Sequence, residues 1–319
     1  GGATCPSLLL EPSRTNLATQ SEYFESWPTT SNCSFTSNYA ISPEGLNNAS
    51  RLVFSGNGYS YGSGFGQSGA VGTIYSLSCY AKRNDNNTQD IGFFANGSGA
   101  VDSSWALTTE WKRFEFSYTT TNNSLVGIAG ENGADVSVYG FQIEQAATYP
   151  TSYIPTYGSS QTRAGEVCGD AGDASTFNDD EGVLYAEISA LANDGTFRGF
   201  TISDNGDPSN RVSITINTTI DSIRALVKSN NATSFDESYN SVDVLSNTKI
   251  AVKYAQNNFA LFINGVKRFS DTSGNTPIGL DVLNFNAGST AIPFHGNVKQ
   301  VLVFKEALSD TELIKLTTI

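Results

Sequence analysis

The stretch YPTSYIPTYGSSQTRAGEVC, residues 149–168, decides how this chain is organised. Its two prolines, Pro150 and Pro155, lack a backbone N–H and fix φ, so neither a helix nor a central strand is expected to run through it. The tyrosine and isoleucine side chains around the prolines make the stretch too apolar for a free linker. We therefore predict an extended, packed connector between two domains.

A second segment near the start, CPSLLLEPSRTNL (residues 5–17), also combines a cysteine, prolines and a run of leucines. We predict that it lies beside the connector. Cys5 and Cys168 fall in these two segments and are expected to meet, either as a disulfide or as two buried thiols in contact. The domain boundary is placed after residue 158, which gives domains 1–158 and 159–319 of near-equal length.

The composition favours an all-β protein and excludes some partners. Charged residues make up 15% of the chain, aromatic residues 11%, and methionine is absent. Without an initiator methionine the chain is expected to be either processed or an excerpt of a longer polypeptide, and we favour the excerpt. Abundant Asn, Ser, Thr and Gly suit short strands joined by polar turns. The net charge of −13 argues against a nucleic-acid partner. No apolar run approaches the ~20 residues of a membrane span, so membrane insertion is not expected.

Strand-like segments recur at the ~8–12-residue spacing that is typical of β-sandwiches. The clearest are ASRLVF (49–54), TIYSLSCYAKR (73–83), VSVYGFQIEQ (136–145), EGVLYAEISAL (181–191), RVSITIN (211–217) and KIAVKYAQNNFALFINGVKRFS (249–270). Asn264-Gly265 is a hairpin signal. Ser309 and Glu312 fit a capping box, which predicts one short C-terminal helix. The predicted fold is two tandem β-sandwiches with that helix docked on a sheet.

Longer motifs carry a resemblance to known families. EGVLYAEIS (181–189), FALFINGVKR (259–268) and VKQVLVFKEALSDTELIKL (298–316) resemble a concanavalin A-like sandwich of the laminin-G type. LLLEPSRTNLATQSEYFESW (8–27), YSLSCYAKR (75–83) and WKRFEFSY (111–118) resemble jelly-roll carbohydrate-binding modules. Joined by TSYIPTYGSSQTRAGEVC (151–168), the two halves resemble tandem modules of bacteriophage tail and tail-fibre proteins.

This resemblance implies a function and its setting. It implies attachment to a host-surface glycan or polysaccharide and a place on a virion or an extracellular surface. It also implies that the chain forms a homo-trimer and contacts other virion proteins. We therefore hypothesise a non-enzymatic glycan-binding adhesion module. Two alternatives stay open: a purely structural virion component without a ligand, and a polysaccharide hydrolase or lyase on the concanavalin A-like fold.

Sugars are recognised by flat aromatic faces together with amide and carboxylate groups. The candidate ligand-binding residues are Tyr59, Tyr61, Phe65, Gln67 and Trp105. The alternative is that alternate members of GYSYGSGF (58–65) simply face a core. Trp27 and Trp111 are interpreted as core anchors, and Cys79 as a small buried thiol in a core strand.

The segment SDNGDPSNR (203–211) is a candidate Ca²⁺ loop. Asp204, Asn205 and Asp207 place several oxygen donors within one short turn, and oxygen is the ligand that Ca²⁺ prefers. The alternative is an ordinary Asn/Asp turn. No cofactor is otherwise expected.

Signals for catalysis are weak. The chain has one histidine, His295. Residues 58–62, GYSYG, match G-x-S-x-G, but a nucleophile elbow needs a strand-to-helix turn and a nearby base. A glycosidase needs two carboxylates ~5–9.5 Å apart. The adjacent pairs in Asp179–Glu181 and Asp236-Glu237 are interpreted as solvated turns, so no catalytic residue is assigned.

Overall fold

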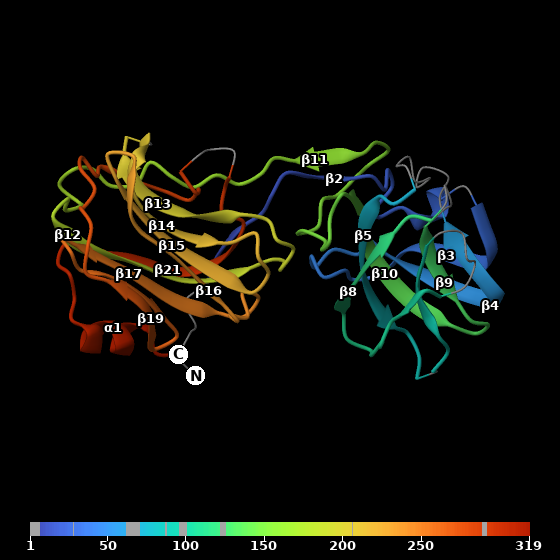
Figure 1. Ribbon diagram of the computed structural model, residues 1–319. Helices are drawn as coiled ribbons and strands as arrows, with labels where there is room; N and C mark the ends of the chain where they lie inside the picture. Colours follow the sequence, from blue (N-terminus) through green and yellow to red (C-terminus); the bar gives the residue numbers. More distant parts are fainter. Residues whose placement is uncertain are drawn as a thin grey trace. The chain divides into compact units, whose positions relative to one another are not determined.

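The chain folds almost entirely into antiparallel β-strands, which confirms the predicted all-β class. The computed structural model describes residues 7–27, 29–61, 71–86, 88–95, 101–121, 126–205, 207–288 and 292–319, and at residues 29, 30 and 57–61 the backbone only. A six-stranded and a five-stranded sheet form one sandwich, and a branched eight-stranded sheet forms the other, each with its own core (Figure 1). A two-stranded sheet, β11-β2, is separate from both. The expected architecture of two β-sandwiches with a short C-terminal helix is therefore confirmed.

The two compact units do not follow the expected division at residue 158. The first module is Ser13–Ala164, and the second module joins Gly1–Pro12 to Gly165–Ile319. The reason is strand β1 (Leu8–Leu10), which pairs with β21 (Gly296–Phe304), so the start of the chain completes a sheet of the second module. The first module is thus inserted between the first two strands of the second.

The second module packs a six-stranded sheet on a five-stranded sheet. The strand orders are β1-β21-β12-β17-β18-β19 and β16-β15-β14-β13-β20. The remaining strands are β12 (Glu181–Ala190), β13 (Arg198–Asp204), β14 (Asp207–Ile216), β15 (Ser222–Ser229), β16 (Ala232–Asn240), β17 (Thr248–Ala255), β18 (Phe259–Ile263), β19 (Val266–Asp271) and β20 (Val282–Asn284). Their inward side chains, mostly Ile, Val, Leu and Phe, form one buried cluster between the sheets.

The predicted helix closes the outer face of the six-stranded sheet. Helix α1 (Asp310–Thr317) begins at a complete capping box, in which Ser309 and Glu312 satisfy each other's backbone N–H groups. Leu313 is fully buried against Tyr185 and Phe262 of the sheet. Both the capping box and the docking are as predicted. No described helix is long and apolar enough to cross a membrane.

The first module is organised around its longest strand, β4 (Ala49–Tyr61). β4 pairs with β10 (Asp135–Gln145) over residues 50–53 and with β9 (Gly127–Gly130) over residues 58–60. The sheet therefore divides at β4 into two branches that enclose an aromatic-rich core. The other elements are β2 (Arg14–Asn16), η1 (Phe24–Ser26), β3 (Thr29–Ala40), β5 (Ile74–Arg83), β6 (Ile91–Phe94), β7 (Ser103–Ser104), β8 (Lys112–Thr119) and β11 (Gln161–Arg163).

Two of the longer strands were not expected from the sequence. β3, TTSNCSFTSNYA, pairs with β4, and β16, ATSFDESYN, pairs with β15. Both lack the regular alternation of apolar and polar residues that marks a half-buried strand. Both are also edge strands, and polar residues are common at sheet edges because they discourage pairing with other chains.

The connector is anchored to the first module by one buried amide. The Asn16 side chain is fully buried, and its Nδ2 donates to the backbone oxygens of Ile154 at 2.8 Å and Phe141 at 3.3 Å. Its Oδ1 accepts the backbone N–H groups of Ala18 and Ile143, each at 3.0 Å. Asn16 thereby joins the N-terminal segment, β10 and the connector, and all four hydrogen-bonding positions of the amide are used.

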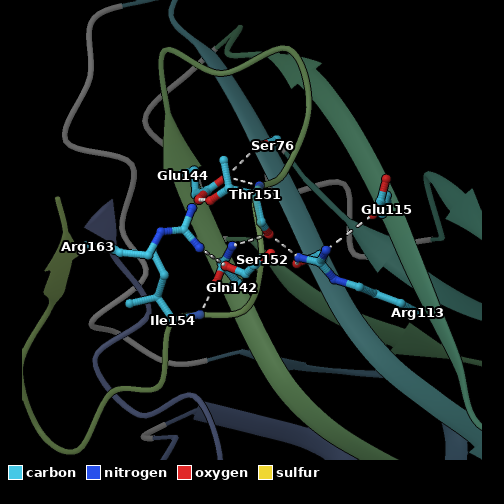
Figure 2. Close-up of polar contacts among 10 residues, drawn as sticks. Ser76, Arg113, Glu115, Gln142, Glu144, Thr151, Ser152, Ile154 and Arg163 are labelled. Carbon is cyan, nitrogen blue, oxygen red and sulfur yellow. Dashed lines mark hydrogen bonds and ion pairs between the residues drawn. The ribbon is translucent and has the colours of Figure 1, made fainter. Parts of the chain in front are cut away.

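Two further buried side chains on β10 hold the same connector (Figure 2). Gln142 donates to the Thr151 oxygen at 3.1 Å and accepts the Ile154 N–H at 2.7 Å. The Glu144 carboxylate accepts both the N–H of Thr151, at 2.8 Å, and its hydroxyl. Burial raises the pKa of Glu144, and the two donors of Thr151 counter that effect.

The predicted pairing of the two proline-bearing segments is confirmed. β11 and β2 form an antiparallel pair with Gln161 opposite Asn16, and farther along the Glu166 N–H donates to the Glu11 oxygen at 2.9 Å. Cys5 lies outside the described residues, so its meeting with Cys168 stays a prediction. In the described part of the chain Cys33, Cys79 and Cys168 are free thiols, and Cys79 is fully buried, as expected.

We expect Asn16→Ala to lower the free energy of unfolding of the chain by about 2–4 kcal/mol, because it leaves buried backbone N–H and C=O groups without partners. Urea denaturation measures this loss. Asn47→Ala is the matched control, since Asn47 is an exposed amide in the same module, and it should stay within about 0.5 kcal/mol of the wild type. Equal effects of both substitutions would contradict the anchoring role of Asn16.

A second prediction concerns acid. Arg51 hydrogen-bonds Asp135 through Nε at 2.8 Å and through Nη2, which lowers the pKa of Asp135. Since the folded pKa lies below the unfolded value of about 3.9, this pair stabilises the fold above that pH and loses its contribution as the pH falls through the folded pKa. The free energy of unfolding of the wild type should exceed that of Asp135→Asn by about 1 kcal/mol near pH 7, and this difference should shrink below pH 4. A pH series of urea denaturations tests this; a constant difference would contradict it.

Candidate functional site

A pocket of about 420 Å³ lies in the first module, between two loops. This volume is within the ~300–1,000 Å³ range of small-molecule sites. One wall is the turn after β5, and the other is the segment between β7 and β8. The lining residues are Arg83, Asp85, Asn86, Thr88, Trp105, Ala106, Leu107, Thr108 and Thr109.

Backbone hydrogen bonds fix the two walls relative to each other. The Arg83 N–H donates to the Thr108 oxygen at 2.7 Å and joins the loops directly. The Trp105 N–H donates to the Ile91 oxygen at 2.8 Å and ties its loop to β6. Asn84 donates through its backbone and its side chain to Asp135, which holds the turn after β5 against β10. The pocket is therefore built on the sheet and not on free loops.

Trp105 lines the pocket, and its ring also belongs to the core of the first module. The side chain is 5% exposed, stacks on Phe114 at a centroid distance of 5.3 Å and meets Phe93 edge-on at 4.9 Å. Asn86, Thr88 and Thr109 are exposed at the rim. The pocket thus has an aromatic interior and a hydroxyl- and amide-bearing edge.

Several buried polar atoms at the pocket have no hydrogen-bond partner. They are Trp105 Nε1 and Arg83 Nη1, together with Oε1 of Gln89, which follows the lining residue Thr88 in the chain. Arg83 Nη2 donates to the Gln89 backbone oxygen, so only part of the guanidinium is satisfied within the protein. Unpaired buried polar groups are rare in folded proteins and cost about 1–3 kcal/mol each, so an incoming ligand with matching groups gains from pairing them.

The predicted aromatic site residues are only partly described. Trp105 lines the pocket. The Tyr59 and Tyr61 backbones lie in β4 but their side chains lie outside the described part, and Phe65 and Gln67 lie outside it altogether. β9 and β6 separate the backbone of Tyr59 from β7, which precedes Trp105. Three strand spacings of ~4.8 Å separate the two backbones by about 14 Å along the sheet. Tyr59 and Trp105 therefore do not start from adjacent strands. The assignment of the tyrosines stays a prediction.

The candidate Ca²⁺ residues fall at the hairpin between β13 and β14. Asp207 accepts the Ser209 N–H at 2.8 Å, and the Asn205 N–H donates to Asp281 at 2.5 Å. Within the described residues, no three His, Cys, Asp or Glu side chains are grouped so as to hold a metal ion. Calcium binding by Asp204, Asn205 and Asp207 stays a prediction.

The carboxylates considered for catalysis have structural partners. Asp179 accepts the N–H groups of Gly279 and Leu280 at 2.6 and 2.9 Å, and Glu181 accepts that of Ala307 at 3.0 Å. Asp236 forms an ion pair with Arg224 at 2.6 Å. The described part of the GYSYG segment, residues 58–61, lies inside β4, which is paired on both sides there.

The sequence did not indicate most of the pocket residues. AKRNDNNTQD (81–90) is recognisable as a turn, but nothing in it identifies Arg83 or Asp85 as pocket residues. The relevant signal is spatial, since the pocket exists only because the Arg83 N–H meets the Thr108 oxygen 25 positions later.

Comparisons with known proteins give weak similarities. No protein-family model and no curated protein matches the chain. Among solved structures, the "IT-sialidase CBM40" of Ruminococcus gnavus bound to α2,3 sialyllactose is 16% identical over 48% of this chain and 95% of its own, with a TM-score of 0.39. A SAP-like pentraxin from Limulus polyphemus is 10% identical over 46% and 72%, with a TM-score of 0.37. The NanB sialidase of Streptococcus pneumoniae (K499G mutant) is 14% identical over 48% and 28%, also at 0.37. Similarity this low does not establish a shared function.

The packing of Trp105 generates a stability prediction. Trp105→Ala removes a buried ring between Phe93 and Phe114 and should lower the free energy of unfolding by about 3–5 kcal/mol. Trp105→Phe retains an aromatic ring and loses no internal hydrogen bond, because Nε1 has no partner in the protein; its loss should be about 1–2 kcal/mol. Thermal and urea denaturation of both variants measure this, and equal losses would contradict the core role of the ring.

Proposed function

We propose that this chain is a non-enzymatic glycan-binding adhesion module and that the pocket between Arg83 and Thr109 holds the sugar. The observation that carries the proposal is the unpaired, buried Nε1 of Trp105, which is a lining residue of a pocket large enough for a sugar ring. A sugar presents hydroxyl oxygens as acceptors and hydroxyl hydrogens as donors. The pocket offers partners for both.

The lining residues supply these partners from different sides. Arg83 and Trp105 donate, the Asp85 carboxylate accepts, and Thr88 and Thr109 do either. The rim is exposed, so one sugar ring of a longer glycan can enter the pocket while the rest of the glycan stays outside. Few, well-placed polar groups around an aromatic surface are the usual composition of a sugar site.

The enzymatic alternative is less well supported by this pocket. Among its lining residues in the described part of the chain, Asp85 is the one carboxylic acid, whereas glycosidases use two carboxylates ~5–9.5 Å apart. A purely structural role explains the sandwiches but makes no use of the pocket. Each alternative predicts a different experimental outcome.

The wider setting is also part of the proposal. The place in a phage tail fibre or comparable surface appendage, a homo-trimer, contact with other virion proteins and attachment to a host-surface polysaccharide rest on the sequence resemblance. We propose them together with glycan binding, and they are separable from it experimentally.

A glycan array with the full chain and two variants tests the proposal. The wild type should be retained by at least one glycan. Asn86→Ala/Thr88→Ala, which changes only exposed rim side chains, should weaken binding about five- to tenfold, as expected for the loss of one or two hydrogen bonds. Asn47→Ala is the control and should bind as the wild type does.

The outcomes separate the three hypotheses. Absence of binding to any glycan by the wild type would overturn glycan binding and favour the structural role. Release of reducing ends or unsaturated sugars from a bound polysaccharide would overturn the non-enzymatic part. Equal binding by the rim variant and the wild type would move the site away from this pocket.

A further inference from the structure

Two hydrogen-bond donors at the pocket have no partner in the protein. Trp105 Nε1 and Arg83 Nη1 are both buried without a partner, and both nitrogens carry N–H groups only. Their side chains come from the two opposite walls, which the bond between the Arg83 N–H and the Thr108 oxygen holds together. A carboxylate can satisfy both, because each of its two oxygens accepts hydrogen bonds.

The charge of Arg83 is a second feature of the pocket. None of the ion pairs among the described residues involves Arg83. Its guanidinium donates through Nη2 to the neutral backbone oxygen of Gln89. By contrast, Arg51 nearby in the same module is neutralised by Asp135. A charge-assisted bond from Arg83 is about twice as strong as a neutral one, so an anionic acceptor is preferred.

We infer that the pocket selects a sugar carrying a carboxylate, which Arg83 and Trp105 hold through its two oxygens. Asp85, Thr88 and Thr109 then meet the hydroxyls of the same ring. This inference rests on the proposed glycan binding and adds the chemical class of the ligand. Guanidinium groups suit a carboxylate because their planar N–H pairs match its two oxygens.

The net charge of the chain restricts this ligand further. At −13 the chain repels a polyanion, while at physiological salt a charge acts over only ~8 Å. A single carboxylate that reaches Arg83 is attracted locally, whereas a chain of carboxylates also meets the repulsion of the surrounding surface. The expected ligand is therefore a largely neutral glycan with one acidic sugar at its end.

The test uses an array on which each glycan with one terminal carboxylate is printed beside its methyl ester. Esterification removes the charge and keeps the ring and its hydroxyls. The full wild-type chain should bind the acid at least tenfold more tightly than the ester. For Arg83→Gln this ratio should fall to near one, while folding is monitored by thermal denaturation.

A matched pair of tryptophan variants separates binding from packing. Trp105→Phe removes an N–H that has no protein partner, so it should weaken binding of the acid about fivefold or more. Trp27→Phe is the control: Trp27 is also buried, at 3% exposure, but its Nε1 already donates to the Gln20 oxygen at 2.9 Å. It should lose stability and keep the affinity of the wild type.

Three results would overturn the inference. Equal binding of acids and esters, with neutral glycans still bound, would show that the pocket does not select a carboxylate and would leave the proposed glycan binding intact. An equal loss of affinity in Trp27→Phe and Trp105→Phe would show that packing, and not the indole N–H, matters. Binding of no glycan at all would remove both the inference and the proposed function.

Discussion

The buried amide of Asn16 is the interaction on which the organisation of this chain depends. It joins the N-terminal segment, the long strand β10 and the connector through four hydrogen bonds, in a place that water does not reach. The part of the connector between its two prolines forms no strand, so its backbone groups need side-chain partners. Asn16, Gln142 and Glu144 supply them. The cost of leaving any of these groups unpaired makes the arrangement specific.

This constraint explains why the chain divides as it does. The chain enters the first module through β2 and leaves it through β11, and the two strands pair. Residues before β2 and after β11 belong to the second module, where β1 forms an edge strand beside β21. An inserted module whose ends lie together can fold around its own core without disturbing the sheet into which it is inserted.

The buried polar groups of the pocket differ from the Asn16 amide in their hydrogen bonding. The Asn16 amide uses all of its donors and acceptors, whereas Trp105 Nε1 and Arg83 Nη1 at the pocket have no partner in the protein. Trp105 cannot turn away, because its ring is fixed between Phe93 and Phe114. Incomplete pairing on a rigid framework is what a preorganised binding site requires, since a ligand then gains bonds without ordering the protein.

The sequence by itself determined the all-β class, most strands, the capped C-terminal helix and the pairing of the two proline-bearing segments. These follow from alternation, turn residues and proline chemistry, which act over a few neighbouring positions. It did not reveal the polar edge strands β3 and β16, the role of β1 in the second module, or Arg83 as a pocket residue. Those depend on which backbone groups meet across long separations, as Leu9 meets Asn297 and Arg83 meets Thr108. Only the tertiary structure decides such pairings, because the free energy of a buried hydrogen bond or a filled core depends on the partner that folding brings and not on the residue alone.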